Sequence, residues 1–353
     1  MASDPSDSEK RKLSISFVML NHNHGAYLRG SLGATLAQTR AADEIIVIDD
    51  ASTDGSIPIL EEIAAQNPTI RLIRNKQRIG VVPNLNKGLR EARGDYISFP
   101  AADDLIFPDF LAETSSLLDR HPDAAFAAAC ADIWDNRNVV IGHRPVIWPT
   151  AKAAYVGPEQ FRALISGADN FFLGAVTLYR RAALNELGGF DPELGSMSDG
   201  FVARRMAARH GFCFIPKALG VWRVHGENYS VVMATSEREL DRMIARSVEI
   251  LQKEPAGLFP ARYPKLLSRR LHFGAGRLVA LLEDIARPEI QERLSRIAGG
   301  AALDRAAFGA AAWLGPLRTR AAIGWLALRL RPYSFFLLIE RQIYQRLRRP
   351  RST

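Results

Sequence analysis

Short apolar runs alternate with amphipathic segments along the first third of the chain, and this alternation restricts the fold more than any other feature. Strand-like runs occupy residues 13–20, 44–48, 70–73 and 96–99, and helical spacing of apolar residues occupies 27–36, 57–65 and 85–92. Successive strands joined by helices form a parallel sheet with helices on both faces. The sequence therefore predicts an α/β, Rossmann-like domain with a mainly parallel central sheet.

The remainder of the chain continues this pattern less regularly and then becomes helical. We expect helices at 108–120, 181–187 and 201–209, and strands at 124–133, 171–179, 212–215 and 219–224. Composition divides the 353 residues into a polar N-terminal tail, 1–12, an α/β domain, 13–235, and a helical C-terminal region, 236–353. The N-terminal tail has no apolar core, so we expect disorder there and no secretory signal.

Basic residues are concentrated near the end of the chain. The formal net charge is +8, and arginines crowd the stretch after residue 317, where apolar residues such as Trp325, Phe335 and Leu338 lie between them. This mixture is typical of an amphipathic helix on an anionic membrane surface, and a helical bundle packed on the protein is the alternative. No run approaches the roughly 20 apolar residues of a membrane span. We expect a cytoplasmic protein, peripheral at the inner face of the membrane if the C-terminal tail binds lipid.

Two other classes of protein are disfavoured. The basic tail lacks aromatic stacking motifs and a reading helix, so we expect no nucleic-acid partner. The two cysteines, Cys130 and Cys213, lie in apolar, strand-like runs. Two thiols in a chain of this size indicate buried, reduced side chains rather than a disulfide framework.

Paired carboxylates follow two of the predicted strands. Asp49 and Asp50 end the second strand, and Asp103 and Asp104 follow the fourth. Open α/β sheets bind ligands at the carboxyl ends of their strands. Adjacent carboxylates repel each other unless a cation lies beside them, so Asp103 and Asp104 indicate a divalent metal that carries a substrate phosphate. Capping of the following helix is the plainer interpretation of the same pair.

Other candidates carry two interpretations each. Asp50 either accepts a hydrogen bond from a base or ribose, or belongs to an ordinary strand–helix connection. Asp199 precedes a predicted helix and is either a general base or a helix cap. His225 ends a predicted strand and is either a metal ligand or structural. Lys76 and Arg78 lie near a turn and face either a diphosphate or solvent. The residue types alone leave these alternatives open.

The order of these motifs resembles that of family 2 glycosyltransferases of the GT-A fold, from Leu13 to Ser230. The matching segments are Asn23-His24, Tyr27-Leu28, Gln38-Thr39, the run from Glu44 to Gly55, Gly80, Asn86, Gly88, Gly94-Asp95-Tyr96-Ile97, Ala102-Asp103-Asp104, Tyr179-Arg180-Arg181, Gly188-Gly189-Phe190-Asp191, Ser198-Asp199, and Arg223 with His225. The ordered set is much more specific than any single motif.

This resemblance implies a role for each candidate residue. Asp50 would contact the base of the donor, and Asp103 would hold a divalent metal, Mn²⁺ or Mg²⁺, on the diphosphate of a nucleotide sugar. Asp104 would lie beside the donor sugar, Asp199 would deprotonate the acceptor hydroxyl, and His225 would approach the metal or the phosphates. The remaining positions assigned to donor binding are Asn23, Arg78, Asn86 and Ala102.

The implied reaction is an inverting, metal-dependent transfer of a hexose from a nucleotide sugar, with a UDP-sugar as the first choice, to a hydroxyl acceptor. Many relatives glycosylate lipid-linked or surface polysaccharide precursors, so a glycan or lipid-linked acceptor is expected by analogy. The nucleoside diphosphate leaves as the anomeric carbon gains oxocarbenium character, while a carboxylate takes the proton of the acceptor.

Four residues depart from the family pattern. Ala101 stands where the first acid of the metal motif is common, and Ser198 stands where an acid often precedes the catalytic aspartate. Leu20 and His22 replace a proline and a tyrosine before the first asparagine motif. Ala101 and Ser198 favour the alternative function, a catalytically silent nucleotide-sugar-binding or scaffold protein of a glycan-assembly complex.

Overall fold

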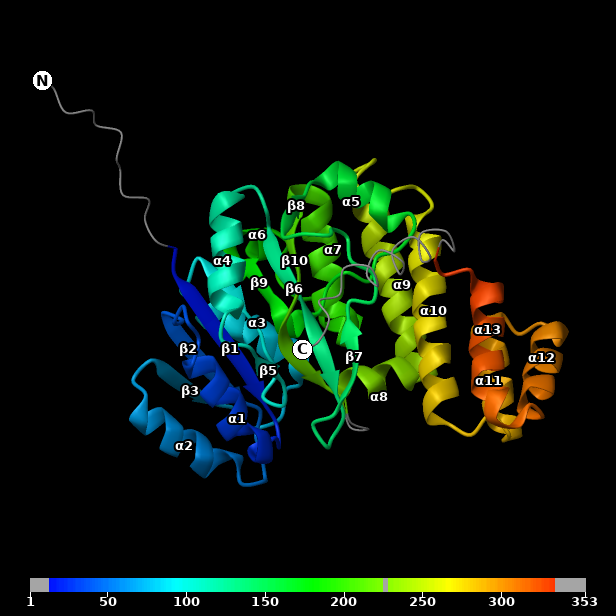
Figure 1. Ribbon diagram of the computed structural model, residues 1–353, viewed down its shortest axis with the longest axis horizontal. Coiled ribbons are helices and arrows are strands. Elements are labelled where there is room, and N and C mark those ends of the chain that lie inside the picture. Colours follow the sequence, from blue (N-terminus) through cyan, green and yellow to red (C-terminus); the bar gives the residue numbers. More distant parts are fainter. Residues whose placement is uncertain (1–12, 225–227, 334–353) are drawn as a thin grey trace, which may run out of the picture.

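A ten-stranded mixed sheet forms the centre of the computed structural model, which describes residues 13–224 and 228–333 (Figure 1). The strand order is β3-β2-β1-β4-β9-β6-β10-β5, with β7 paired to β6 and β8 paired to β10. The strands are β1 (Ile15–Asn21), β2 (Glu44–Asp49), β3 (Ile70–Arg74), β4 (Tyr96–Ser98), β5 (Leu105–Ile106), β6 (Phe126–Trp134), β7 (Val140–Arg144), β8 (Ala154–Val156), β9 (Thr177–Arg180) and β10 (Phe212–Arg223).

The first four strands are parallel, as are β6 and β10. Strand β9 runs antiparallel to both of its neighbours, β4 and β6. The α/β fold predicted from the alternating pattern is therefore confirmed, and the antiparallel strands lie in the half of the chain where that pattern is less regular.

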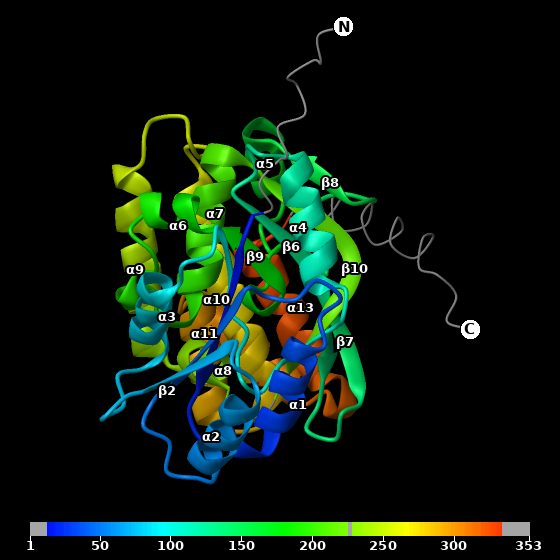
Figure 2. The same ribbon diagram turned by 90° about the vertical axis from the view of Figure 1, so that its left-hand side faces the viewer.

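Helices cover both faces of the sheet. The helices of this part are α1 (Gly25–Leu36), α2 (Ser56–Gln66), α3 (Val81–Glu91), α4 (Phe110–Arg120), α5 (Pro158–Ile165), α6 (Arg181–Glu186) and α7 (Ser198–His210), with 3-10 turns η1 (Gly174–Val176) and η2 (Pro192–Met197). Figure 2 shows α3, α6 and α7 on one side of the sheet and α1 and α4 on the other.

The buried strand residues explain why the chain forms this sandwich. Residues 45–48 of β2 are all apolar, β-branched and no more than 2% exposed, which is typical of a strand covered on both faces. Alternate residues of this strand belong to two separate apolar cores, one under each helical layer. Gly88 lets α3 approach β1 closely, because a Cβ there would lie 2.4 Å from Cγ1 of Val18.

The C-terminal helices pack beside the sheet domain and on one another. They are α8 (Tyr229–Thr235), α9 (Glu237–Lys253), α10 (Tyr263–Leu282), α11 (Pro288–Ala298), α12 (Ala302–Ala312), the turn η3 (Gly315–Leu317) and α13 (Arg318–Leu330). Leu251, Tyr263 and Leu267 join the core under α7, whereas α10 to α13 enclose a third core of their own. No helix in the ranges 13–224 and 228–333 is both long enough and apolar enough to cross a membrane.

Three details differ from the sequence-based expectations. The strand expected at 171–179 begins only at Thr177, because η1 precedes it. The two strands expected at 212–215 and 219–224 form one strand, β10, which has register shifts on either side of Ala218. Strands β5, β7 and β8 and helix α5 have no counterpart in the expectations. Cys130 and Cys213 are both buried and free, as expected, and burial raises the pKa of each thiol to about 12.

Candidate active site

The candidate site lies at one edge of the sheet, where the parallel strands β1, β2 and β4 have their carboxyl ends. Asp50 directly follows β2, and Asp103 and Asp104 follow β4 after a short turn. Ala101 forms a parallel bridge with Leu20, so this turn extends β4 beside the end of β1. The register of the sheet therefore brings the two acidic segments to the same edge, as expected from the parallel order.

Asp49 and Asn23 shape the loop that follows β2. Asp49 Oδ1 accepts hydrogen bonds from Asn21 Nδ2 at 2.7 Å and from Ser52 Oγ at 2.6 Å. Asn23 has a left-handed backbone (φ 58°), and its Oδ1 accepts from the backbone N–H of Thr53 at 2.8 Å. These contacts give both side chains a supporting role in the loop. A contact between Asn23 and a nucleotide-sugar donor, which the sequence predicts, would have to use the Nδ2 group of its amide.

Asp50 organises the segment before α3. Its Oδ1 accepts from Asn75 Nδ2 at 2.8 Å and from the N–H of Ile79 at 2.9 Å, and its Oδ2 accepts from the N–H of Gly80 at 2.8 Å. Burial alone would raise the pKa of Asp50, but these donors, together with Asn84, outweigh it and lower the pKa. An ionised carboxylate accepts about four hydrogen bonds, so roughly one remains for a ligand.

Asp103 and Asp104 form an adjacent acidic pair in which both residues are only 6% exposed. Arg223, at the end of β10, donates its backbone N–H to Asp104 Oδ1 at 3.0 Å, and its Nη1 reaches the backbone oxygen of Asp103 at 2.7 Å. Asn228 Nδ2 lies 3.5 Å from Asp103 Oδ2. Burial and the charge of Asp103 raise the pKa of Asp104 well above its ordinary value, so the pair favours a nearby cation.

Asp199, at the start of α7, lies against the turn that precedes β9. Strand β9 pairs with β4 through Leu178 and Ser98, and η1 comes directly before β9. A Cβ on Gly174, the first residue of η1, would lie 2.3 Å from Oδ2 of Asp199. Burial raises the pKa of Asp199, although the N–H of Gly200 and the charge of Arg204 oppose this shift. The carboxyl group at the start of α7 is therefore buried against η1, the turn that leads into the neighbour of β4 in the sheet.

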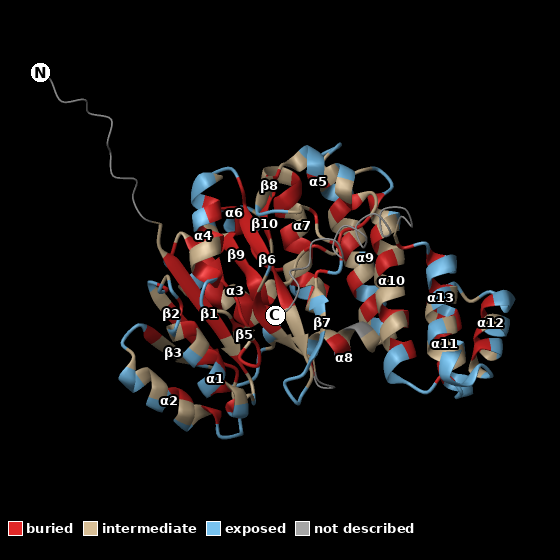
Figure 3. Ribbon diagram, viewed as in Figure 1, coloured by how far each residue is buried: buried red, intermediate tan, exposed pale blue. Residues whose placement is uncertain are grey.

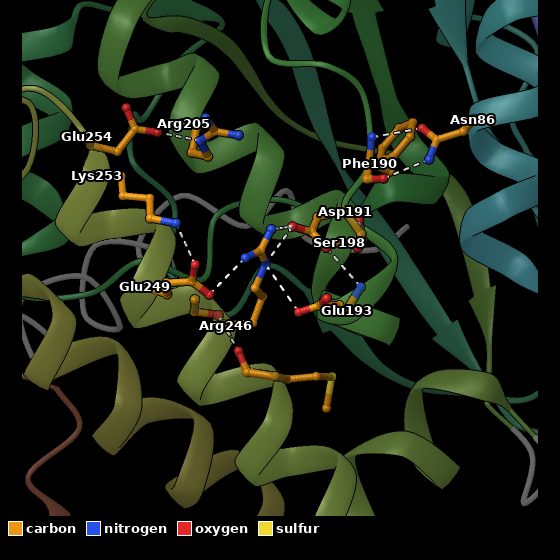
Figure 4. A network of polar contacts seen from close by, with 12 residues as sticks. Asn86, Phe190, Asp191, Glu193, Ser198, Arg205, Arg246, Glu249, Lys253 and Glu254 are labelled. Atoms are coloured by element: carbon orange, nitrogen blue, oxygen red, sulfur yellow. Dashed lines mark hydrogen bonds and ion pairs between the residues drawn. The ribbon is translucent and has the colours of Figure 1, made fainter.

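The loop before Asp199 is fixed from two sides. On one side Asn86 of α3 makes two bonds with the backbone of Phe190, from Nδ2 to the carbonyl at 2.7 Å and from the N–H to Oδ1 at 2.9 Å. On the other side Arg246 of α9 donates to Asp191 Oδ2 at 2.9 Å (Figure 4). The backbone oxygen of Asp191 in turn accepts a hydrogen bond from the hydroxyl of Ser198 at 3.0 Å. We therefore interpret Asn86 as a support for this loop rather than as a donor-binding residue.

The other predicted site residues are less informative. Arg78 is exposed, and it has no ion pair within the described residues. Ala102 is fully buried with its side chain in a core, and its N–H donates to the Leu20 carbonyl at 3.1 Å, so only its carbonyl is free to face a donor. His225 lies outside the described residues.

A divalent metal is compatible with this set of groups under one condition. In the described ranges, no group of three or more His, Cys, Asp or Glu side chains converges on a common point. Ions such as Mg²⁺ are often held by one or two carboxylates together with substrate phosphates. The buried carboxylates of Asp103 and Asp104 therefore fit an ion that arrives with a diphosphate, and do not fit one held by protein ligands alone.

Several contributors were missed by sequence reasoning. Asn75 and Asn84 support Asp50, and Gly174 makes room for Asp199. Arg223 contacts both acids of the pair and stacks on Tyr27, with its guanidinium carbon 5.2 Å from the ring centroid. Arg223 and His225 form the last motif of the family resemblance. This motif was the one signal in the sequence for the role of Arg223, and the sequence gives no such signal for Asn75, Asn84 or Gly174.

Comparisons with known proteins agree with this geometry. A family model described as "Glycosyl transferase family 2" matches residues 16–188. A relative named "Uncharacterized protein MT1568", from Mycobacterium tuberculosis, is 30% identical over 238 residues, which cover 65% of this chain and 73% of the relative. An "Uncharacterized glycosyltransferase alr2836" from Nostoc is 27% identical over 234 residues, 64% of this chain and 70% of the relative.

Two solved structures share the fold at low sequence identity. The mannosyltransferase PcManGT from Pyrobaculum calidifontis, in complex with GDP-Man and Mn²⁺, is 20% identical with a TM-score of 0.58 and covers 96% of this chain and 88% of its own. S. aureus TarS 1–349, in complex with UDP-GlcNAc, is 18% identical with a TM-score of 0.60 and covers 90% of each chain. At these identities the similarity establishes the architecture alone.

Proposed function

The chain belongs to glycosyltransferase family 2 and moves a sugar from a nucleotide-sugar donor, and we propose that it does so with inversion, using Asp199 as the general base. The observation that supports this proposal is the close approach of Asp199 to Gly174, in the turn before β9, the strand that pairs with β4. A single base on the acceptor side activates a hydroxyl for in-line attack, which inverts the anomeric carbon.

The donor would lie along the edge between Asp50 and Asp103. Asp50 is ionised and accepts three hydrogen bonds from the protein. Its remaining lone pair is suited to an N–H of a base or a hydroxyl of a ribose. Asp104 lies one residue from Asp103 and adjoins β10 through Arg223, which is compatible with a position beside the donor sugar. UDP is our first choice of nucleotide, and solved relatives hold UDP-GlcNAc and GDP-Man.

Asp103 would hold Mn²⁺ or Mg²⁺ on the diphosphate, with Asp104 and His225 nearby. When bound, such an ion supplies Lewis-acid stabilisation of the departing nucleoside diphosphate. The protein contributes the negative charge that attracts the ion, and the burial of Asp103 and Asp104 strengthens this attraction.

Asp199 would take the proton of the acceptor. Burial raises the pKa of Asp199, and this makes its carboxylate a stronger base than an ordinary carboxylate. The acceptor that we propose is a hydroxyl of a glycan or of a lipid-linked precursor of a surface polysaccharide, handled on the cytoplasmic side of a membrane.

Two measurements test the proposal in sequence. Thermal-shift screening against nucleoside diphosphates, with and without Mn²⁺, identifies the nucleotide, and we expect stabilisation by one diphosphate that depends on the ion. Donor hydrolysis and transfer are then assayed with the matching nucleotide sugar. Asp103→Asn should lose the ion-dependent binding, whereas Asp199→Asn should keep it and lose transfer by about 10²- to 10⁴-fold.

Asp123→Asn is the matched control, because Asp123 is exposed and lies on the connection between α4 and β6. Its turnover should equal that of the wild type. Unchanged transfer in Asp199→Asn would refute the role of the base. Ion-dependent nucleotide binding without transfer to any acceptor in a broad panel would instead favour a binding or scaffold role.

A further inference from the structure

Two arginines, one on β7 and one on α10, lack an acidic partner in the part of the chain that the structure describes. Arg144 is the last residue of β7, and Arg277 lies in the second half of α10. Neither side chain makes an ion pair or a hydrogen bond with a described residue. By contrast, the neighbouring Arg204 and Arg270 both pair with Asp169. We call Arg144 and Arg277 the arginine pair.

Strand β7 lies at the acidic edge of the sheet. Strand β9 is antiparallel to both β4 and β6, so β4 and β6 run in the same direction. Strand β7 pairs with residues 131–134, the last four of β6, and therefore lies at the edge where β4 has its carboxyl end. Its residues are half-buried or exposed, whereas the strands at the centre of the sheet are buried (Figure 3). A side chain of β7 is thus available to a ligand at this edge.

The environment of Arg144 connects it to the acidic pair. Its guanidinium carbon lies 6.0 Å from the ring centroid of Trp222. Trp222 directly precedes Arg223, whose backbone N–H donates to Asp104 Oδ1. The contact with the ring leaves the five N–H groups of the Arg144 guanidinium without an acceptor. The end of β10 therefore supports the acidic pair and also positions a guanidinium that is free to bind an anion.

Tyr333 connects the two arginines. Arg270, Phe273 and Arg277 are spaced three and four residues apart, so they lie on one face of α10. The ring centroid of Tyr333 lies 5.6 Å from the guanidinium carbon of Arg270 and 6.1 Å from the ring centroid of Phe273. Arg144 is close enough to interact electrostatically with both Arg277 and Tyr333. The arginine pair is therefore brought together beside Tyr333.

The charges of the arginine pair favour a phosphate as the ligand. Burial and the charge of Arg277 lower the pKa of Arg144, because a buried cation beside a second cation is unfavourable. An anion between the two guanidinium groups removes this cost. A phosphate monoester carries nearly two negative charges and three acceptor oxygens, and guanidinium groups bind such oxygens through paired hydrogen bonds. Two arginines therefore match a phosphate better than a single carboxylate.

The arginine pair lies on the side of the proposed base. Tyr333 interacts electrostatically with Arg204 as well as with Arg144, and Arg204 interacts in the same way with Asp199. Asp50, which would contact the base of the donor, follows β2, and β2 is four positions away from β6 in the sheet. This arrangement assigns the arginine pair to the acceptor rather than to the nucleotide.

We propose that the arginine pair binds a phosphate group of the acceptor and so selects acceptors that carry a phosphate close to the hydroxyl that receives the sugar. The assignment to the acceptor rests on the proposed function, whereas the binding of phosphate does not. The phosphate belongs either to a lipid phosphate or to a phosphate-bearing glycan, and the second experiment below distinguishes these two sources.

The first experiment measures phosphate binding without turnover. Thermal shift of the full-length protein is followed against inorganic phosphate in EDTA at constant ionic strength, so that no divalent ion draws the anion to the acidic pair. Arg144→Gln/Arg277→Gln is compared with Arg137→Gln/Lys265→Gln, which removes two charges from exposed positions before β7 and on α10. We expect the wild type and the control to be stabilised equally, and the arginine-pair variant to need at least tenfold more phosphate.

Two further variants separate phosphate binding from a structural role. Arg144→Lys/Arg277→Lys keeps both charges and should bind phosphate with intermediate strength. In phosphate-free buffer, the glutamine variant should be at least as stable as the wild type, because it relieves repulsion. Glu340 is the one acid after Tyr333 in the sequence. Loss of stability in the glutamine variant that is non-additive with Glu340→Gln would show that the chain itself neutralises the pair, and would overturn the proposal. Equal stabilisation of the glutamine variant and the wild type by phosphate would also overturn it.

The second experiment assigns the phosphate to the acceptor. Transfer is measured to matched acceptors with and without a phosphate, in one series attached to a lipid and in another to a soluble glycan. The ratio of kcat/KM for the phosphorylated acceptor to that for the neutral acceptor should fall at least tenfold in the glutamine variant and stay unchanged in the control. The series in which the ratio falls identifies the source of the phosphate.

The other outcomes of this experiment are distinct. A rise in the KM for the donor, with the acceptor ratio unchanged, would place the phosphate in the donor and overturn the proposal. Phosphate binding that requires the arginine pair, in a wild-type protein that transfers sugar to no acceptor, would instead refute the proposed function and support the phosphate site.

Discussion

Arg246 of α9 holds Asp191 in the loop that leads to the proposed base. Its Nε donates to Asp191 Oδ2 at 2.9 Å, its Nη2 lies 2.8 Å from the same oxygen, and its Nη1 is bonded to Glu249 at 2.8 Å (Figure 4). Because Asp191 accepts the hydroxyl of Ser198, this contact links the helical region to the first turn of α7. The position of Asp199 therefore depends on a helix outside the sheet domain.

We expect Arg246→Ala to lower kcat by roughly ten- to hundredfold, because a displacement of a catalytic group by about 1 Å can reduce the rate by that factor. The KM for the donor should change little, because the proposed donor site uses Asp50 and Asp103 rather than the loop that Arg246 holds. Arg246→Lys should restore part of the rate. Arg242→Ala is the control, because Arg242 is on the same helix and its ion pair, within the part of the chain that the structure describes, is with Glu239 three residues earlier. A loss confined to thermal stability, with kcat unchanged, would contradict the positioning role.

Gly174→Ala tests the space reserved for the base. The added Cβ would lie 2.3 Å from Oδ2 of Asp199, so the carboxylate must move. Transfer should fall by about 10² or more while ion-dependent nucleotide binding, followed by thermal shift, persists. Gly33→Ala in α1 has no neighbour within 4 Å of the new Cβ and should leave activity intact. Wild-type turnover in Gly174→Ala would show that Asp199 need not occupy its present position.

Asp104→Asn should stabilise the ion-free protein at neutral pH. Burial raises the pKa of Asp104 above its value in the unfolded chain, so its stabilising contribution is complete at low pH and is lost as the pH rises through the folded pKa. An asparagine keeps an oxygen for the N–H of Arg223 and removes the charge. In EDTA we expect the variant to melt a few degrees higher than the wild type at neutral pH.

This difference in melting temperature should narrow as the pH falls below about 4, the ordinary pKa of an aspartate in the unfolded chain, because the wild-type carboxyl then becomes protonated in both states. Differential scanning fluorimetry across pH, with and without Mn²⁺, measures it. Mn²⁺ with the nucleoside diphosphate should stabilise the wild type more than the variant. Equal melting temperatures in EDTA at neutral pH would show that the raised pKa has no consequence for stability.

The buried ion network between α7 and α10 should be important for stability. Asp169 is 2% exposed and accepts from Tyr263 at 2.9 Å and from Arg270 Nη1 at 3.2 Å, and it also pairs with Arg204 at 3.6 Å. Removing one partner of a buried pair leaves an uncompensated charge, so Arg270→Ala should cost about 3–5 kcal/mol of unfolding free energy. Urea denaturation checks this, with Arg269→Ala as the neighbouring control. A cost below about 1 kcal/mol would show that water replaces the lost contact.

The central strands were predictable from sequence because burial on both faces requires continuous apolar runs. Residues 45–48 satisfy this requirement, and both acidic pairs follow from the chemistry of strand ends. Strand β7 was not predictable in the same way. Val139, Val140 and Ile141 are about half exposed, and the strand forms only because β6 is available as a partner. Phe171 shows the opposite error, since it is buried in the core without belonging to a strand.

Within the site, the acids were predictable and their supports were not. Asn86 and Phe190 are 104 residues apart, and nothing in either local sequence indicates that they bond. The same holds for Gly174, whose importance depends on how α7 packs against η1. Such contacts depend on tertiary packing, which a pattern of residue types does not contain.

The shared core under α7 has a practical consequence for any attempt to isolate the sheet domain. Composition changes near residue 235, but Leu251, Tyr263 and Leu267 fill the same apolar core as Phe201 and Met206. A fragment that stops at the compositional change would therefore expose that apolar surface to water and leave the carboxylate of Asp169 without Tyr263 and Arg270. A shortened enzyme made for crystallisation or assay has to retain α9 and α10 to remain folded.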